Sequence, residues 1–252
     1  MGSASTGRQD RGDGVELAWS KLDGRGPTVV FLPGYGSDMT GDKATALAAF
    51  CAARGQAMLR FDYSGHGASG GRFEDGTIGI WCHDALAAID RLTEGPLLLI
   101  GSSMGGWIAL LVALARRERI AALVGIAAAP DFTERVGPAL TAAQREELAQ
   151  RGVIYRPSRY GAPTPLTRVL LEDGPRRLVL TQPIPLDCPV RLLHGQADPD
   201  VPWELALRIA ERITGGDVRV ILVKDGDHRL SRPQDLALLR RTVAELLGED
   251  GA

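Results

Sequence analysis

The feature of the chain that most constrains its fold is a turn of small residues between two apolar segments. Residues 95–100 read Gly-Pro-Leu-Leu-Leu-Ile, which has the length and composition of a buried strand. Residues 101–105 read Gly-Ser-Ser-Met-Gly, and the mainly apolar residues 106–114 are long enough for a buried helix. Ser103 has glycine two positions before it and two positions after it. Side chains there would collide with the adjoining strand and helix, so the pattern predicts a serine in a strained turn.

A serine in this G-x-S-x-G context is typical of the nucleophile elbow, in which the hydroxyl is exposed at the end of a central strand. Ser103 has both glycines, whereas its neighbour Ser102 does not. The alternative interpretation is a small-residue loop that only caps the following helix. Ser103 is therefore a candidate nucleophile, provided that later loops supply a base and an acid.

Segments typical of strands and helices alternate along most of the chain. The predicted strands are 15–21, 28–32, 57–61, 97–101, 121–127, 190–194 and 218–223. The predicted helices are 44–54, 77–92, 106–114, 203–213 and 234–247. This alternation predicts an α/β fold with a mostly parallel central sheet and helices on both faces.

The alternation stops between residues 131 and 187, which contain seven prolines and short helical patterns near 141–150 and 166–172. We expect this segment to be a small cap inserted into one domain, whose core consists of residues 15–130 and 188–252. Residues 1–14 are polar and rich in glycine, without the apolar region of a signal peptide. They are expected to be a disordered tail.

Composition argues against several classes of partner. The chain has 252 residues and a formal charge of −2, so neither nucleic acid nor an anionic membrane is expected as its main partner. No apolar run approaches the ~18 residues of a membrane span. The three cysteines are scattered and the four histidines lack the spacing of metal ligands. This indicates a reducing, cytoplasmic location, no disulfide framework and no metal site. Nothing in the sequence points to a particular oligomeric state.

A serine nucleophile needs a base to take its proton and an anion to orient that base. In a parallel sheet such groups gather after the carboxyl ends of the strands. Asp198 and Asp200 both follow the predicted strand at 190–194, and Asp198, in the tight turn, is the better acid, whereas Asp200 fits a helix cap. His228 follows the last strand. Ser103, Asp198 and His228 thus form a candidate triad in the order serine, acid, histidine.

The other histidines are expected to have different roles. His194 ends a strand and is expected to pack or bond locally. His66 lies in a glycine-rich loop, where a structural role is favoured, and His83 lies in a predicted helix with its side chain exposed.

The negative charge that develops on a carbonyl oxygen during acyl transfer needs backbone N–H donors. Met104, the residue after the nucleophile, is one candidate donor. The loop after the predicted strand at 28–32 reads Pro-Gly-Tyr-Gly at 33–36, and the N–H of Tyr35 is the other candidate. The Tyr35 side chain would then be free to line the pocket.

With these motifs the chain resembles the α/β-hydrolase superfamily over residues 15–247. The motifs are LPGYGSD (32–38), RFDYSGHGASGG (60–71), GSSMGGW (101–107), HGQADPDVP (194–202) and GDHRLS (226–231). Together with Gly-Ile-Trp at 79–81, they resemble a narrower branch of palmitoyl-protein thioesterases and acyl-glucuronide esterases with bacterial relatives. One departure is Pro33-Gly34, where many members have His-Gly.

The resemblance implies that Ser103, Asp198 and His228 are the triad and that Tyr35 and Met104 donate to the oxyanion. It implies hydrolysis of a small-molecule ester or thioester through an acyl-enzyme, without a cofactor. Oxygen esters are the favoured substrates, and an acyl-protein or acyl-CoA thioesterase is the main alternative. Carbon–carbon bond hydrolysis, perhydrolysis and a non-catalytic binding role on the same fold remain open.

Substrate contacts are predicted less directly. The candidates are Tyr35, Trp107, Tyr155, Arg156 and Arg159. An arginine of this group could pair with a carboxylate on the substrate. The alternative is that the arginines form a solvated basic face.

Overall fold

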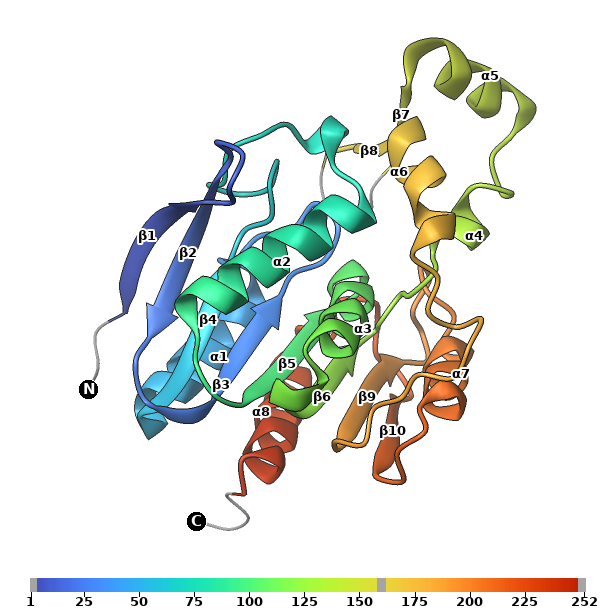
Figure 1. The fold of residues 1–252 in the computed structure, drawn as a ribbon. Helices are drawn as coiled ribbons and strands as arrows, with labels where there is room; N and C mark the ends of the chain where they lie inside the picture. The colour runs from blue at the N-terminus through green and yellow to red at the C-terminus, as the bar shows by residue number, and fades with distance from the viewer. Residues whose placement is uncertain (1–3, 158–161, 249–252) are drawn as a thin grey trace.

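One twisted sheet runs through the centre of the molecule (Figure 1). In the computed structural model, which describes residues 4–157 and 162–248, eight strands form this sheet in the order β1-β2-β4-β3-β5-β6-β9-β10. The strands are β1 (Ser5–Asp10), β2 (Glu16–Leu22), β3 (Arg25–Leu32), β4 (Gln56–Phe61), β5 (Leu97–Ser102), β6 (Ile120–Ile126), β9 (Val190–Gly195) and β10 (Val218–Val223). The pairs β1–β2 and β2–β4 are antiparallel and the other pairs are parallel. The predicted mostly parallel α/β sheet is confirmed.

Helices cover both faces of the sheet (Figure 1). One face carries α2 (Ile78–Leu92), α3 (Met104–Ala115) and α7 (Glu204–Arg212), and the other carries α1 (Asp42–Arg54) and α8 (Pro233–Leu246). Successive residues of a strand point to opposite faces. In β5, Leu97 and Leu99 therefore join the core under α3, while Leu98 and Ile100 join the core under α1 and α8. Burial on both faces explains why this strand is apolar throughout.

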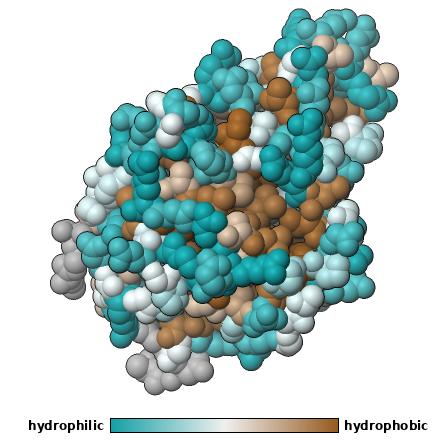
Figure 2. All heavy atoms as spheres, viewed as in Figure 1, coloured by the Kyte–Doolittle hydropathy of each residue, from teal (hydrophilic) through white to brown (hydrophobic). Residues whose placement is uncertain are grey.

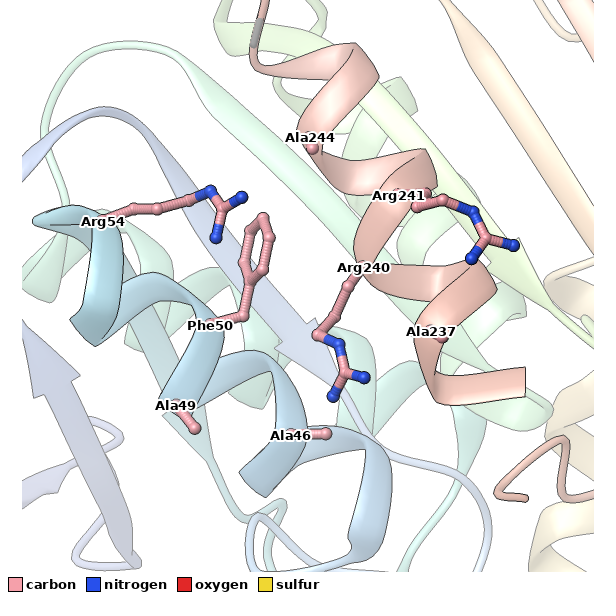
Figure 3. A pocket seen from close by; sticks show the side chains of 8 residues that line it. All are labelled: Ala46, Ala49, Phe50, Arg54, Ala237, Arg240, Arg241 and Ala244. Carbon is pink, nitrogen blue, oxygen red and sulfur yellow. The ribbon is translucent and has the colours of Figure 1, made fainter. Parts of the chain in front are cut away.

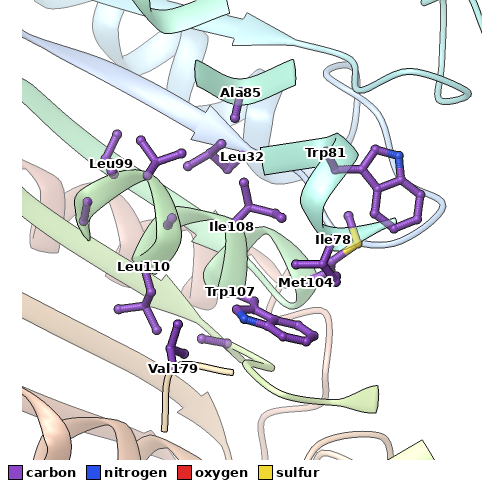
Figure 4. Close-up of a cluster of buried hydrophobic side chains, with 14 of the residues drawn as sticks. Leu32, Ile78, Trp81, Ala85, Leu99, Met104, Trp107, Ile108, Leu110 and Val179 are labelled. Carbon is purple, nitrogen blue, oxygen red and sulfur yellow. The ribbon is translucent and has the colours of Figure 1, made fainter. Parts of the chain in front are cut away.

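The helix α3 is buried along most of its length. Figure 4 shows Trp107, Ile108 and Leu110 of this helix among side chains from the sheet, from α2 and from Val179. A helix enclosed in this way has apolar residues on every side instead of one apolar stripe. No helix within the described residues is long and apolar enough to cross a membrane.

Residues 131–187, here named the cap segment, follow β6 and precede β9 in the chain, and the described part of the segment lies outside the main sheet (Figure 1). The segment contains α4 (Thr133–Val136), α5 (Ala142–Arg151), α6 (Arg168–Asp173) and a separate antiparallel hairpin of β7 (Val153–Arg156) and β8 (Thr164–Thr167). The expected helix at 166–172 begins later than predicted because 164–167 pair with β7. Leu148, Ile154 and Leu170 join the same core as α3. Figure 2 shows apolar side chains gathered over α3 and the neighbouring part of this segment.

The expectation of a disordered tail over residues 1–14 is wrong. Residues 5–10 form β1 and pair with β2 at the edge of the sheet. The sequence of β1 is polar because an edge strand with exposed side chains does not need apolar residues. After β1, Arg11 donates from Nη1 to Oδ1 of Asp84 at 2.9 Å, and Asp84, in α2, is 0% exposed. An ion pair thus attaches this segment to the core.

Replacing Arg11 by alanine leaves the buried Asp84 carboxylate without its cation. We expect Arg11→Ala to lower the free energy of unfolding by about 3 kcal/mol, measured by urea denaturation, because an unpaired buried charge is costly. Asp13, which also pairs with Arg11 but is exposed, is the matched control, and Asp13→Ala should change stability little. Equal, small effects of both changes would contradict the docking of this segment.

Candidate active site

Ser103 lies in the strained turn that the sequence predicts. Its backbone angles are φ 54° and ψ −119°, outside the regions that ordinary residues adopt. A Cβ at Gly101 would overlap the carbonyl oxygen of Gly105, and a Cβ at Gly105 would overlap that of Leu32 in β3. Glycine at both positions is therefore required by the close approach of β5, α3 and the end of β3.

The structure brings Ser103, Asp198 and His228 together from three separate loops. They follow β5, β9 and β10, neighbouring parts of the sheet whose carboxyl ends lie at the same edge. Nε2 of His228 lies 3.0 Å from Oγ of Ser103, and Nδ1 of His228 lies 2.7 Å from Oδ2 of Asp198. A carboxylate only accepts, so Nδ1 carries the proton and Nε2 is left to accept from the serine hydroxyl. Of the two candidate aspartates, Asp198 supplies this carboxylate.

The carboxyl group of Asp198 is buried and is held as an anion. Its Oδ1 accepts from the backbone N–H groups of Asp200 and Val201 at 2.8 and 2.9 Å, and Nε2 of His194 lies 3.2 Å from its Oδ2. Burial alone would raise the pKa of Asp198, but the hydrogen bonds from His194 and His228 outweigh it and hold the pKa well below its usual range. The carboxylate of Asp198 is therefore charged at neutral pH.

Two residues of the candidate triad, together with Asp200, also form a cluster of possible metal ligands. Asp198, Asp200 and His228 offer ligand atoms that all lie within 4.8 Å of one another. However, Nδ1 of His228 and Oδ2 of Asp198 are already joined to each other by a hydrogen bond. A metal ion bound there would have to replace the proton that joins Nδ1 to the carboxylate, so this donor set fits an oriented histidine better than a cation site.

The two predicted oxyanion donors flank Ser103. A Cβ at Gly34 would lie 3.4 Å from Cβ of Ser103, which places the loop after β3 directly against Ser103. Met104 is the first residue of α3, where backbone N–H groups have no partner inside the helix. Within residues 4–157 and 162–248, no protein acceptor takes the N–H of Tyr35 or of Met104.

The side chain of Tyr35 is held by the cap segment, whereas the sequence predicts a side chain that is free to line the pocket. Its hydroxyl donates to the carbonyl oxygen of Pro165 in β8 at 2.6 Å. Its ring packs edge-on against Phe73 and Trp81, with centroids 4.9 and 5.6 Å away. The hydroxyl finds its acceptor on the cap segment because a half-buried phenol needs a hydrogen-bond partner. Tyr35 thus joins the loop beside Ser103 to the cap segment.

The prediction that Trp107 contacts substrate is wrong. The side chain is fully buried, packs against Phe132 and donates its indole N–H to the carbonyl oxygen of Arg177 at 3.0 Å. Its position on α3 directs it into the core beneath the cap segment.

The remaining substrate candidates lie on the hairpin of the cap segment. Tyr155 and Arg156 are exposed on β7, and Tyr155 pairs in register with Pro165, the partner of Tyr35. This places the hairpin beside the loop after β3. Arg159 lies outside the described residues.

The other histidines have the kinds of environment that the sequence predicts. His194 is buried and bonds locally, and His83 is exposed on α2. His66 is buried, and its Nε2 accepts the backbone N–H of Gly36 at 3.2 Å. The sequence indicates that His66 is structural but carries no signal for this partner.

A separate groove of about 470 Å³ lies between α1 and α8 (Figure 3). Its lining is basic and apolar, and it includes none of the candidate triad. The lining residues are Ala46, Ala49, Phe50, Arg54, Ala237, Arg240, Arg241 and Ala244.

A single methyl group at Gly105 tests the packing of the turn around Ser103. We expect Gly105→Ala to lower the free energy of unfolding by about 3 kcal/mol in urea denaturation, because the added carbon overlaps backbone that cannot move independently. Gly216, which has open space around its Cβ position, is the control, and Gly216→Ala should be nearly neutral. A Gly105→Ala protein as stable as Gly216→Ala would contradict the close approach.

Comparisons with known proteins identify the family and the fold of the chain. Residues 25–168 match the family described as serine aminopeptidase, S33. The chain is 42% identical over 246 residues to the mouse protein named palmitoyl-protein thioesterase ABHD10, mitochondrial, covering 97% of this chain and 83% of that protein. The solved mouse structure of α/β-hydrolase domain-containing protein 10 superposes with a TM-score of 0.89 at 40% identity, covering 98% and 100% of the two chains. A solved structure from Agrobacterium vitis S4 gives a TM-score of 0.92 at 41% identity, covering 98% of this chain and 99% of that chain.

These relatives do not support the expected cytoplasmic location, since the mouse protein is named as mitochondrial. They do confirm the resemblance drawn from the sequence motifs. The family match spans more than half of the chain, and the similarity to the relatives extends over nearly all of it. The chain belongs to the hydrolase family described as serine aminopeptidase, S33, and has the α/β-hydrolase fold.

Proposed function

We propose that the protein cleaves acyl esters through a covalent intermediate on Ser103, with His228 as general base and Asp198 as the group that orients it. The observation that carries this proposal is the pair of hydrogen bonds through His228, at 3.0 Å to Ser103 and 2.7 Å to Asp198. A serine with this pair of partners in a strained strand-to-helix turn is arranged for nucleophilic attack.

In the first half of the reaction, Oγ of Ser103 forms a bond to the acyl carbon while its proton passes to Nε2 of His228. The former carbonyl oxygen becomes negatively charged, and the N–H groups of Tyr35 and Met104 donate to it. Asp198 stabilises the imidazolium that forms. His228 then gives the proton to the leaving oxygen, the bond between acyl carbon and leaving group breaks, and the acyl group remains on Ser103.

In the second half, water replaces the leaving group. His228 takes a proton from the water as its oxygen adds to the acyl carbon, and the same N–H donors hold the oxyanion. The bond to Oγ of Ser103 then breaks, and His228 returns the proton to the serine. The products are a carboxylic acid and the unchanged enzyme, and the cycle uses only groups of the protein and water.

A thioester is the second candidate substrate, and the relatives favour it. The mouse protein that is 42% identical is named as a palmitoyl-protein thioesterase. The chemistry above also applies to a sulfur leaving group, because both substrates lead to the same acyl-enzyme. The family description as a serine aminopeptidase would require an amine leaving group on the same triad.

We propose that the cap segment is an insertion in a single domain. We also propose that this segment determines which leaving group the protein accepts. Its hairpin lies beside the loop that carries Tyr35, through the bond to Pro165. Tyr155 and Arg156 are exposed on that hairpin and are the proposed contacts for the part of the substrate that leaves. A basic surface that only interacts with solvent is the alternative role for Arg156.

Replacing Asp198 by asparagine tests the proposed triad, with Asp200→Asn as the matched control. Asp198→Asn should lower kcat for p-nitrophenyl butyrate by about 10⁴-fold, because the amide no longer stabilises the tautomer and charge of His228. Asp200→Asn should retain most activity. A fluorophosphonate probe should modify the wild-type protein at Ser103 and leave Ser103→Ala unmodified, as read by mass spectrometry. Labelling of Ser103→Ala, or equal activity of the two aspartate variants, would refute the assignment.

The leaving group can be tested with two peptides that differ in one atom. One carries a palmitoyl group on serine oxygen and the other carries it on cysteine sulfur in the same sequence. A thioesterase like the named relatives should have a kcat/KM at least about tenfold higher for the thioester than for the oxygen ester. This ratio is taken after each value has been corrected for the spontaneous hydrolysis of its substrate. A higher value for the oxygen ester would identify a carboxylesterase instead.

A further inference from the structure

The loop that carries Tyr35 is hydrogen-bonded to the buried imidazole of His66. His66 is 3% exposed, and its Nε2 lies 3.2 Å from the backbone nitrogen of Gly36, the residue after Tyr35. Gly36 has φ 67°, in the left-handed region, so its peptide groups have an orientation that the chain does not adopt by default. A hydrogen bond at this position fixes the peptide next to the proposed oxyanion donor.

The hydrogen bonds around His66 determine which ring nitrogen carries its proton. Nδ1 lies 3.2 Å from the carbonyl oxygen of Ser64, which also accepts the indole N–H of Trp81 at 3.1 Å. A carbonyl only accepts, so Nδ1 is the protonated nitrogen. Nε2 then keeps its lone pair and can accept from Gly36, whose N–H only donates. Both neighbours therefore require the same neutral tautomer.

Burial keeps His66 in this neutral form. Desolvation lowers the pKa of His66, and the Ser64 carbonyl and the negative charges of Asp84 and Asp38 reduce that effect without reversing it. A second proton would sit on Nε2 and face the N–H of Gly36, so that two donors would oppose each other. The loop can keep its geometry only while the imidazole is neutral.

His66 and Tyr35 also share their aromatic surroundings. The His66 ring lies 4.8 Å from Phe73 and 5.1 Å from Trp81, measured between centroids. The Tyr35 ring packs edge-on against the same two side chains, with centroids 4.9 and 5.6 Å away. Phe73 and Trp81 therefore connect the Tyr35 ring to the His66 ring through aromatic contacts.

From these contacts we propose that His66 is a positioning residue for the oxyanion hole: its neutral Nε2 accepts from Gly36 and thereby keeps the N–H of Tyr35 aimed at the reacting carbonyl. The inference rests on the proposed function, since it assigns His66 to the acyl-transfer step at Ser103. His66 does not touch the substrate. Its effect is expected on the transition state and not on the bound substrate.

The decisive comparison is between variants of His66 that keep or remove the acceptor at the Nε2 position. His66→Phe keeps a ring but has no acceptor, and should lower kcat for p-nitrophenyl butyrate by about 10²-fold with KM changed by less than about threefold. His66→Gln can place its amide oxygen at the position of Nε2 and should recover most of kcat. His66→Asn reaches only the position of Nδ1 and should remain slow. A trifluoromethyl ketone, whose alkoxide occupies the oxyanion hole, should lose affinity in parallel with kcat/KM.

The control is Tyr63→Phe. Tyr63 packs against His66 at 5.6 Å, and its buried hydroxyl has no hydrogen-bond partner among the described residues. Tyr63→Phe removes only this hydroxyl from the same aromatic cluster and keeps the hydrogen bond between His66 and Gly36. We therefore expect kcat and inhibitor affinity to stay at the wild-type level.

Each outcome bears on one of the two proposals. An inactive, unlabelled wild-type protein would overturn the proposed function itself. With an active wild type, equal kcat values in His66→Gln and His66→Asn would overturn the role of His66, and this comparison holds even where His66→Phe does not fold. A loss of thermal stability in His66→Phe with unchanged kcat and inhibitor affinity would show that His66 only supports packing.

Discussion

The contact on which the site depends is between backbone atoms where β5, α3 and the end of β3 meet. Gly101 faces the carbonyl of Gly105, and Gly105 faces the carbonyl of Leu32, at distances that admit no side chain. This contact forces Ser103 into its strained conformation and brings the loop after β3 against it. The strain is sustained because the sheet and the buried helix on either side are tightly packed. The hydroxyl is thus positioned by the fold before any partner approaches.

Much of this arrangement could be predicted from the sequence because it depends on local patterns. Short apolar strands ending in polar loops gave the positions of Ser103, Asp198 and His228, and the carboxyl ends of parallel strands meet at one edge. The position of Asp198 in the turn after the strand favours it over Asp200 as the acid. In the structure, the carboxylate of Asp198 is hydrogen-bonded to His228. The glycine spacing predicted the turn because its cause lies within a few residues.

The errors concern contacts between distant parts of the chain. Arg11 and Asp84 are 73 residues apart in the chain. The polar sequence of residues 1–14 therefore predicts a disordered tail, because nothing in it indicates the ion pair with the core. Tyr35 and Pro165 are separated by 130 residues, and no local pattern links them. The sequence does not tell whether Trp107, four residues after Ser103, faces the pocket or the core. Only the position of the cap segment decides between the two.

The bond from Tyr35 to Pro165 has a consequence for exchanging cap segments among related enzymes. The acceptor is a main-chain carbonyl, so the identity of the side chain at position 165 is unimportant for it. A transplanted segment of unrelated sequence could still dock, provided that its hairpin brings one peptide oxygen to the same place. Specificity could then be altered without rebuilding the loop beside Ser103. A segment that lacks that oxygen would leave the half-buried hydroxyl of Tyr35 without a hydrogen-bond partner. The lost stability would then affect the loop beside Ser103 as well as the cap segment.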